Sequence, residues 1–360
     1  MENCFRIGFL GAGSIAKSHS YALDSLKYFY ADSPSIRKIV VASPTPNSRE
    51  GFASRFGFQE AISPEEIWGK DIDTLFILGP NQVHTPQLLK AVTQDNIKRI
   101  YVEKPIGTCQ ADIDALEVLN GSAHGKLILM GFQYLQKSAI RKALFHWQNE
   151  DFGDPIHFRA EYLHSSYLDP DYRQSHANRF KSMPIDGAAV DLGSHPLSLL
   201  VAFLGDQLRV VNAKVSGSFE DVPQYTDLCT TLLLEEGKTG AIGTLVASRI
   251  SSGAGDHLSL EIRGHRGSLQ FSTHQPDFYK TYLPEEGWRI HHVLNNYKPF
   301  SDFPGKSAPS GWIRALIHNQ YLFFMEKQKN SFLPNLSHGI LVQRLLQQTA
   351  SHVLGESVHR

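Results

Sequence analysis

The sequence predicts an α/β protein of two domains, the first built on a doubly wound parallel sheet and the second on a predominantly antiparallel open sheet. In the first third of the chain, short β-branched runs alternate with amphipathic helical stretches, as in βαβ units. From about residue 136, long strands follow one another between glycine-containing turns. At roughly 150 residues per domain, 360 residues also suit two domains, which we place at 1–131 and 132–360.

In the first domain, strands are indicated by short apolar runs and helices by apolar residues at helical spacing. Helices are expected up to about Leu26 and over residues 47–56, 83–94 and 112–120. Residues 63–66 predict another helix start, because they combine a capping serine, a proline at the first helical position and two acids. About six parallel strands are expected, among them residues 6–10, 39–42, 74–78, 100–102 and 127–131.

The second domain is expected to be an antiparallel sheet with helices on one face, because turn residues separate its strands at hairpin-like spacing. Its strands are predicted at 156–164, 210–219, 228–235, 240–248 and 258–263. Its helices are predicted at 188–203, 311–329 and 339–354. Residues 275–309 have prolines and aromatic residues without a clear period, which predicts a long loop over a site.

Composition and charge favour a globular protein with a small-molecule partner. Hydrophobic residues make up 41% of the chain and charged residues 20%, which suits a packed core and gives disordered or collagen-like classes no support. The 35 basic and 36 acidic residues leave a net charge of -1, so no global positive field attracts nucleic acid or an anionic membrane. We therefore expect neither partner.

The cysteines and the N-terminus predict a cytoplasmic protein without a metal site. Cys4, Cys109 and Cys229 are far apart and form no Cys-x-x-Cys pair for metal binding or redox exchange. The first residues lack the basic start, apolar stretch and cleavage site of a signal peptide. The most apolar stretch, residues 197–204, is far shorter than the ~20 residues that a membrane span needs.

A glycine fingerprint directly follows the first predicted strand and opens a helix, the context that dinucleotide binding requires. Gly11 permits a tight turn, Gly13 lets the backbone approach a pyrophosphate, and Ala16 permits close packing of the helix on the strand. Backbone N–H groups at the helix start, near Ser14 and Ile15, face the anion. A plain glycine turn is the structural alternative. The pattern predicts a Rossmann domain that binds NAD(P).

The end of the second predicted strand lacks the acid that would hold the ribose hydroxyl of NAD. Hydroxyl groups at Ser43 and Thr45, with the cation of Arg49, instead suit a 2′-phosphate, which a carboxylate would repel. The alternative is that Arg49 is only a solvated helix residue. We expect NADP as the preferred cofactor, with NAD as the other choice.

Residues 79–84 follow the strand predicted at 74–78. Ligands of such sheets lie outside the carboxyl ends of the strands, so Pro80, Asn81 and His84 are expected along the cofactor, with Asn81 and His84 on its nicotinamide side. Helix capping or surface exposure is the alternative for each of these polar residues.

Glu103 and Lys104 lie at the tip of the strand predicted at 100–102, immediately before Pro105. A lysine near a desolvated pocket can lose part of its proton affinity and then polarise a hydroxyl or carbonyl group, or move a proton. The alternative is a surface pair of Glu103 with Lys104, which stabilises little. We expect both residues at the cofactor and Lys104 in catalysis.

The helix predicted at 188–203 carries Asp191 and His195 near its start, four residues apart and therefore on one face. Histidine has the unperturbed pKa nearest neutrality, so His195 is the natural acid/base, with Asp191 orienting it or binding another hydroxyl. A capping aspartate and a core histidine are the alternative. A zinc site lacks further ligands at motif spacing.

Three of these motifs, in this order and spacing, resemble the glucose-fructose oxidoreductase/inositol dehydrogenase (Gfo/Idh/MocA) family. They are the glycine fingerprint extended to His19, the segment Glu103-Lys104-Pro105, and residues 187–195. The resemblance covers residues 5–200 by motif and the later sheet by architecture. It implies a Rossmann domain, a C-terminal α/β domain, a nicotinamide cofactor, and a sugar, polyol or sugar derivative as substrate.

The resemblance also implies that Lys104, Asp191 and His195 match the catalytic positions of the family. It further implies a homodimer or homotetramer in which open sheets pair face to face across a two-fold axis.

Two departures from the family pattern predict an uncommon substrate pocket. Ser198 stands where members often carry an aspartate, and the segment Leu135-Gln136 stands where many carry an arginine. We expect three tyrosines and one arginine to line the substrate pocket. The alternative for the tyrosines is a place in the core, and the arginine would bind a phosphate or carboxylate group of the substrate. These residues are Tyr134, Tyr162, Tyr167 and Arg173.

We expect an NAD(P)-dependent dehydrogenase or reductase that moves a hydride between nicotinamide and a carbinol or carbonyl carbon, while Lys104 and His195 handle the hydroxyl proton. One rival is a cofactor-bound, non-catalytic sensor or co-repressor. Another is an NAD-dependent glycosidase on the same fold. Only a dehydrogenase changes the redox state of its cofactor in proportion to product.

Overall fold

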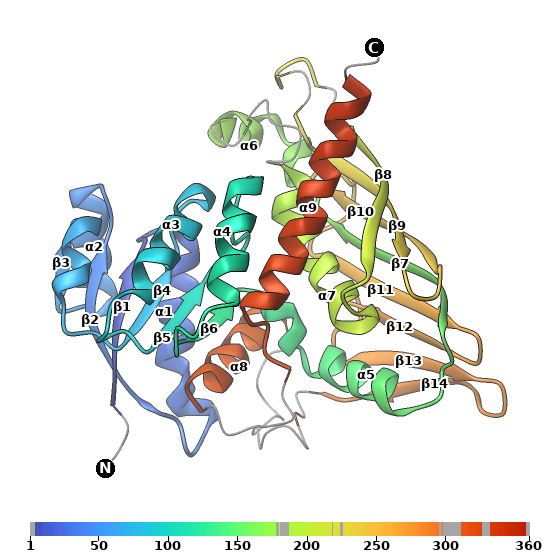
Figure 1. Ribbon diagram of the computed structural model, residues 1–360, viewed down its shortest axis with the longest axis horizontal. Helices are drawn as coiled ribbons and strands as arrows, with labels where there is room; N and C mark the ends of the chain where they lie inside the picture. The colour runs from blue at the N-terminus through green and yellow to red at the C-terminus, as the bar shows by residue number, and fades with distance from the viewer. Residues whose placement is uncertain are drawn as a thin grey trace. The chain divides into compact units, whose positions relative to one another are not determined.

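The protein is described by a computed structural model over residues 4–177, 180, 187–217, 219–223, 226–294, 297, 311–325 and 332–357 (Figure 1). The chain divides into two compact units: unit 1 is Met1–Gln136 with Asn295–Ile340, and unit 2 is Lys137–Leu294 with Leu341–Arg360. The chain passes from unit 1 to unit 2 after Gln136 and returns to unit 1 over Asn295–Ile340.

Unit 1 contains a six-stranded sheet in the order β3-β2-β1-β4-β5-β6, and all its strand pairs are parallel. This confirms the predicted sheet. The three-residue strand β3 was not among the predicted strands, because so short a run shows no periodicity. The strands are β1 (Cys4–Leu10), β2 (Ser35–Ala42), β3 (Glu60–Ile62), β4 (Thr74–Ile77), β5 (Arg99–Val102) and β6 (Leu127–Met130).

Helices connect these strands near the positions predicted from apolar spacing. The expected helix start at Ser63 is present as a 3-10 helix, where the Glu66 carboxylate accepts hydrogen bonds from the backbone N–H and hydroxyl of Ser63 at 2.8 and 2.7 Å. The connecting helices are α1 (Ser14–Phe29), α2 (Pro46–Phe56), η1 (Pro64–Gly69), α3 (Asn81–Val92) and α4 (Gln110–Asn120).

Aromatic packing on one face of the parallel sheet explains why a late segment belongs to unit 1. The ring of Phe76 lies 5.1 Å from those of both Phe9 and Tyr101, measured between centroids. Helix α8 (Trp312–Met325) joins this cluster, with the ring of Phe323 at 5.9 Å from Phe76. Burial of the apolar side of α8 therefore holds that segment of the chain on the first sheet.

Unit 2 contains an eight-stranded sheet in the order β14-β13-β12-β11-β7-β10-β9-β8. The pair β10·β7 is parallel and the other pairs are antiparallel, which confirms the predominantly antiparallel sheet. The strands are β7 (Pro155–Leu163), β8 (Leu208–Ser216), β9 (Cys229–Glu236), β10 (Ile242–Ser248), β11 (His257–Gly264), β12 (Ser268–Ser272), β13 (Phe278–Leu283) and β14 (Gly287–His292).

Helices α5 (Ser138–Asn149) and α7 (Ser194–Leu204) pack on one face of this sheet, α5 against β12 and β13 and α7 against β7 and β11 (Figure 1). In the last helix, α9 (Leu336–Ser357), Gln348 accepts a hydrogen bond from the backbone N–H of Val210 in β8 at 2.8 Å. The opposite face of the sheet carries none of these helices.

The prediction of a long loop over 275–309 is wrong for residues 278–292, which form the hairpin of β13 and β14. The ring of Phe278 stacks on His292 at 4.3 Å and that of Tyr279 on His291 at 4.5 Å, so cross-strand ring pairs stabilise the hairpin. Gly287 supplies the positive φ of 68° at its turn. Residues 295–296 and 298–309 of the expected loop lie outside the described residues.

The helix expected at 188–203 begins differently from the prediction. Residues Ala189–Gly193 form a π-helical turn, and α7 follows it without a break. A π-helical turn is wider than an α-helical one, so Asp191 and His195 do not share the regular face of one α-helix.

The buried carboxyl group of Asp227 holds the start of this π-helical turn. Its Oδ2 accepts a hydrogen bond from the N–H of Ala189 at 2.7 Å, and its Oδ1 accepts one from the Thr230 hydroxyl at 2.6 Å. A Cβ atom on Gly187 would lie 1.9 Å from the Asp227 carbonyl oxygen, so this approach requires glycine. Burial raises the pKa of Asp227 to about 6, although both hydrogen bonds act in the opposite direction.

Replacing Asp227 by asparagine should therefore change stability in a pH-dependent way. Because the folded-state pKa lies above the usual 3.8, the folded protein keeps a proton that the unfolded chain releases, and the wild type loses stability as pH rises from 3.8 to about 6. Asp227→Asn keeps an acceptor for Ala189 and carries no charge. Its thermal midpoint relative to wild type should rise across this interval, by the equivalent of roughly 3 kcal/mol at most, and then stay constant. A difference that is independent of pH would contradict the assignment.

Candidate active site

The carboxyl ends of four strands of unit 1 meet at one edge of the sheet. Leu10 of β1 is in register with Ala42 of β2 and Ile77 of β4, and Ile77 is in register with Val102 of β5. The glycine fingerprint and the three other polar segments of unit 1 follow these strand ends directly. The parallel topology therefore brings them to the same edge.

The turn after β1 fits a bound dinucleotide. Gly11 has a φ of 125°, and a Cβ atom there would lie 2.6 Å from the Leu78 carbonyl oxygen. A Cβ atom on Gly13 would meet nothing within 4 Å, which leaves open space beside the backbone. Helix α1 begins at Ser14, so the N–H groups of Ser14 and Ile15 belong to the first turn, where N–H groups lack helical partners.

The turn after β2 places the expected phosphate-binding residues next to one another. Ser43 is buried and Thr45 is exposed at the start of α2. Arg49 Nη1 donates a hydrogen bond to the Ser43 carbonyl oxygen at 2.9 Å, so the guanidinium group is anchored beside this turn. It is therefore more constrained than a freely solvated helix residue.

The segment after β4 places Pro80 and Asn81 at the start of α3, with His84 in its first turn. His84 is buried, and its Nδ1 and Nε2 lie 2.6 and 2.9 Å from the carbonyl oxygens of Pro105 and Gly79. Burial lowers the pKa of His84, which favours the neutral ring, and a neutral ring donates only one hydrogen bond. His84 thus lies between the loops after β4 and β5, and its neutral ring donates to one of the two carbonyl oxygens.

Glu103 is buried at the end of β5, and His19 of α1 lies beneath it. Glu103 Oε1 is 2.8 Å from His19 Nε2, and its Oε2 accepts a hydrogen bond from the backbone N–H of Lys104 at 3.2 Å. Gln320 Nε2 of α8 donates to His19 Nδ1 at 2.7 Å, so His19 Nε2 carries the proton that is donated to Glu103. A Cβ atom on Gly131 would lie 2.7 Å from Glu103, which explains the glycine after β6.

Unlike Glu103, Lys104 is partly exposed, and its bond to Pro105 is cis. Its backbone N–H is held by the buried carboxylate of Glu103. The tip of β5 therefore presents an ammonium group from a backbone that Glu103 fixes.

In unit 2, Asp191 lies in the π-helical turn and His195 in the first turn of α7. His195 is buried, and its ring packs edge-on against Tyr162 with 5.8 Å between centroids. The Asp191 carboxylate accepts a hydrogen bond from Arg249 at 2.8 Å. Ser198 is also buried in α7.

The expected substrate residues lie in different surroundings. Tyr134 is buried in η2 (Gln133–Gln136) of unit 1, whereas Tyr162 and Tyr167 are buried in unit 2. Arg173 is also buried, and donates to Asp221 at 2.8 Å and to the carbonyl oxygens of Tyr167 and Leu168 at 2.9 and 3.1 Å. These bonds anchor Arg173 within the protein and weigh against the expected contact with a phosphate or carboxylate group.

The structure thus brings together the cofactor segments with Lys104 in unit 1, and Asp191 with His195 in unit 2. Three buried polar residues near these groups were missed by sequence reasoning: Gln320, Asp227 and Arg249. No short motif contains them, and Gln320 lies 301 residues from its partner His19.

Within the described parts of the chain, no helix is long and apolar enough to cross a membrane, and no group of three or more His, Cys, Asp or Glu residues has the geometry of a metal site.

Comparison with known proteins identifies a family for both parts of the chain. Residues 5–130 match the oxidoreductase family with an NAD-binding Rossmann fold, and residues 140–270 match the GFO/IDH/MocA C-terminal domain. Levoglucosan dehydrogenase of Pseudarthrobacter phenanthrenivorans is 27% identical over 306 residues, which cover 77% of this chain and 75% of that protein. Glucose-6-phosphate 3-dehydrogenase of Bacillus subtilis is 22% identical over 288 residues, with 76% of each chain covered.

A solved structure of levoglucosan dehydrogenase in complex with NADH and L-sorbose has the same fold, with a TM-score of 0.85 and 22% identity over 98% of both chains. The resemblance inferred from the sequence motifs is confirmed, because the two family matches together span most of the chain. The chain therefore belongs to the Gfo/Idh/MocA family of oxidoreductases, whose N-terminal domain is an NAD-binding Rossmann fold.

Proposed function

We propose that this oxidoreductase transfers a hydride between a nicotinamide cofactor and a carbinol or carbonyl carbon of a sugar, polyol or sugar derivative. The observation that carries the proposal is Lys104, which follows β5 at the same sheet edge as the open cradle around Gly13. The dehydrogenases reported above, which are named for levoglucosan and glucose 6-phosphate, support a sugar-like substrate.

The cofactor, when bound, supplies the hydride acceptor or donor. The residues of this chain bind the substrate and manage its proton. Lys104 and His195 are proposed to accept the proton of the reacting hydroxyl during oxidation and to return one during reduction. Asp191 is proposed to orient His195 or to bind a neighbouring hydroxyl. Glu103 is proposed to position the backbone of Lys104, as its 3.2 Å hydrogen bond suggests.

The contacts of three residues refine their proposed roles. Because both ring nitrogens of His84 face carbonyl oxygens, we assign it to holding the loops beside the nicotinamide, with Asn81 closer to the cofactor. Tyr162 packs against His195 and is retained as a residue of the substrate pocket. Arg173 is assigned to support of the segment that carries Tyr167.

An assay with purified protein tests the proposal. The protein is incubated with NADP or NAD and a panel of sugars, inositols and sugar phosphates, while the absorbance of the reduced cofactor is followed. Accumulation of reduced cofactor in proportion to oxidised product supports a dehydrogenase. Binding of sugar without turnover would favour the sensor, and glycoside cleavage without net cofactor reduction would favour the glycosidase.

A preference for NADP over NAD is the cofactor part of the proposal. Arg49→Ala should weaken NADP binding by roughly 10- to 100-fold more than NAD binding, because one charged hydrogen bond contributes about 1.5 to 3 kcal/mol. Ser43→Asp should reverse the preference by repelling the phosphate. Arg55→Ala, in the last turn of the same helix, is the control. Equal dissociation constants of the wild type for both cofactors, measured by fluorescence titration, would disprove the preference.

Substitution of Lys104 or His195 tests their proposed role in proton transfer. Lys104→Ala and His195→Ala should each lower kcat by roughly 100- to 10,000-fold, with nearly unchanged cofactor affinity. Lys104→Arg should lower kcat as well, because arginine does not release its proton at working pH. Lys90→Ala on the exposed surface of α3 is the control. Near-normal rates in all these variants would exclude an essential acid/base role for the pair.

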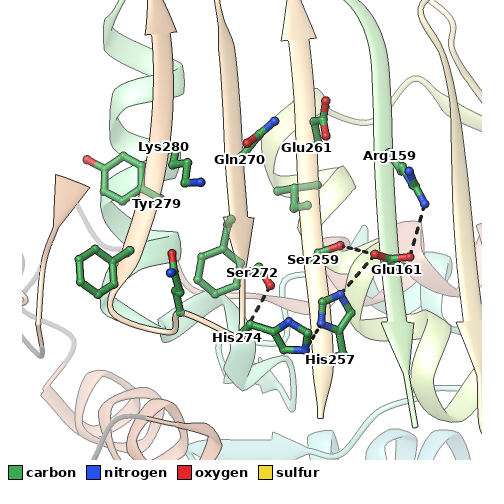
Figure 2. A pocket seen from close by; sticks show the side chains of 14 residues that line it. Arg159, Glu161, His257, Ser259, Glu261, Gln270, Ser272, His274, Tyr279 and Lys280 are labelled. Atoms are coloured by element: carbon green, nitrogen blue, oxygen red, sulfur yellow. Dashed lines mark hydrogen bonds and ion pairs between the residues drawn. The ribbon is translucent and has the colours of Figure 1, made fainter. Parts of the chain in front are cut away.

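We further propose a homo-oligomer in the cytoplasm. On the face of the unit 2 sheet that carries neither α5 nor α7, strand register places exposed Ile242, Leu233 and Ile290 among charged residues. Figure 2 shows Arg159 and Lys280 on this face, where they line a depression of about 470 Å³. Apolar groups mixed with charges of both signs suit pairing with a second copy.

The three cysteines, none of which forms a disulfide, accord with a reducing compartment.

Light scattering tests this assembly. Ile242→Arg should lower the molecular mass toward that of the monomer, because it places a charge at the proposed interface without changing the core. Val118→Arg, at an exposed apolar position of α4, should leave the mass unchanged. A monomeric wild type, or an unchanged mass for Ile242→Arg, would rule out this interface.

A further inference from the structure

Arg249 directly follows β10 and is fixed by its backbone between two segments of unit 2. Its N–H donates to the Leu228 carbonyl oxygen at 2.8 Å, and its carbonyl oxygen accepts a hydrogen bond from the N–H of Tyr167 at 3.1 Å. Leu228 is the neighbour of Asp227, the residue that holds the π-helical turn. The side chain of Arg249 therefore starts from a rigid point close to that turn, which β10 contacts.

The guanidinium group is buried in a mixed aromatic and acidic environment. Arg249 Nη2 donates to Asp191 Oδ2 at 2.8 Å, and its Cζ lies 4.9 Å from the centre of the Tyr167 ring. Burial by itself would lower the pKa of Arg249, but the nearby carboxylates outweigh it and the net shift is upward. Within the described residues, its Nε and Nη1 atoms have no hydrogen-bond partner.

The two partners of this ion pair differ strongly in exposure. The side chain of Arg249 is 5% exposed, whereas that of Asp191 is 41% exposed. A pair of two exposed residues contributes little. Breaking this pair would leave the buried charge of Arg249 uncompensated, so Arg249 holds the Asp191 carboxylate in place. The buried Arg249 thus anchors an acid that is accessible to solvent.

We propose that Arg249 is a positioning residue that fixes the Asp191 carboxylate for the reaction, an inference that rests on the proposed function of Asp191. The ion pair restrains Asp191 within the π-helical turn and balances its charge. It thereby restrains the segment from which His195 also projects. The alternative is that Arg249 only stabilises the fold through Tyr167 and the two acids around it.

A double-mutant cycle separates these roles. The variants are Asp191→Asn, Arg249→Met and the corresponding double variant, each measured for kcat, KM, cofactor dissociation constant and thermal midpoint. Arg249→Met should lower kcat by about 100-fold at unchanged cofactor affinity, because misplacement of a catalytic group by roughly 1 Å has that effect. Adding it to Asp191→Asn should lower kcat no further, because Arg249 acts through Asp191.

Two further variants serve as a control and as a replacement in this test. Arg289→Met removes an exposed ion pair with Glu286, 3.0 Å long, beside the turn between β13 and β14, and should leave kcat unchanged. Arg249→Lys keeps the positive charge and replaces Arg249→Met in the cycle if the methionine variant does not fold. The lysine variant should show kcat between those of the wild type and Asp191→Asn, and its double variant should again match Asp191→Asn.

Independent effects on kcat, in which the double variant loses the product of the two single losses, would overturn the inference. So would coupling that appears in the thermal midpoints but not in kcat, because it would make the pair structural. An active wild type with either result would leave the proposed dehydrogenase function intact. A wild type without activity on every sugar of the panel would instead overturn the function and the inference together.

Discussion

The buried hydrogen bond between His19 and Glu103 is the interaction on which the site of unit 1 depends. It requires α1 to approach the tip of β5, and this in turn requires the close helix packing that Ala16 permits. It also requires glycine at position 131 and a donor, Gln320, from helix α8. Because an unpaired carboxylate in this place would be costly, the whole arrangement forms together and presents Lys104 from a fixed backbone.

Unit 2 also restrains an accessible charged group through buried residues, but there the accessible group is an acid and the residue that pairs with it is a cation. There a buried carboxyl group, Asp227, caps the π-helical turn, and a buried cation, Arg249, holds the accessible acid Asp191. In both units a buried charged or polar group restrains a polar group that is nearer to solvent. The low dielectric of these sites strengthens each interaction, and the rigid backbone around Gly187 and Leu228 preserves its geometry.

The parallel sheet and the fingerprint were predictable because buried strands and special turns leave strong local signals, as at Gly11 and around Ser63. The hairpin of β13 and β14 was missed because its stability comes from cross-strand pairs such as Tyr279 with His291, which have no simple period. The π-helical turn could not be predicted from the sequence, because the four-residue spacing from Asp191 to His195 fits an α-helix equally well. Gln320 and Arg249 depend on partners distant in sequence, and only the folded chain reveals them.

In the proposed reaction, a hydride passes directly between the substrate carbon and the nicotinamide. The most direct measurement uses a sugar that the protein oxidises, deuterated at the reacting carbinol carbon, and determines by mass spectrometry where the label goes. Direct transfer predicts deuterium in the reduced nicotinamide, in proportion to the oxidised sugar formed. Deuterium released to water, or returned to the sugar without net reduction of the cofactor, would contradict it.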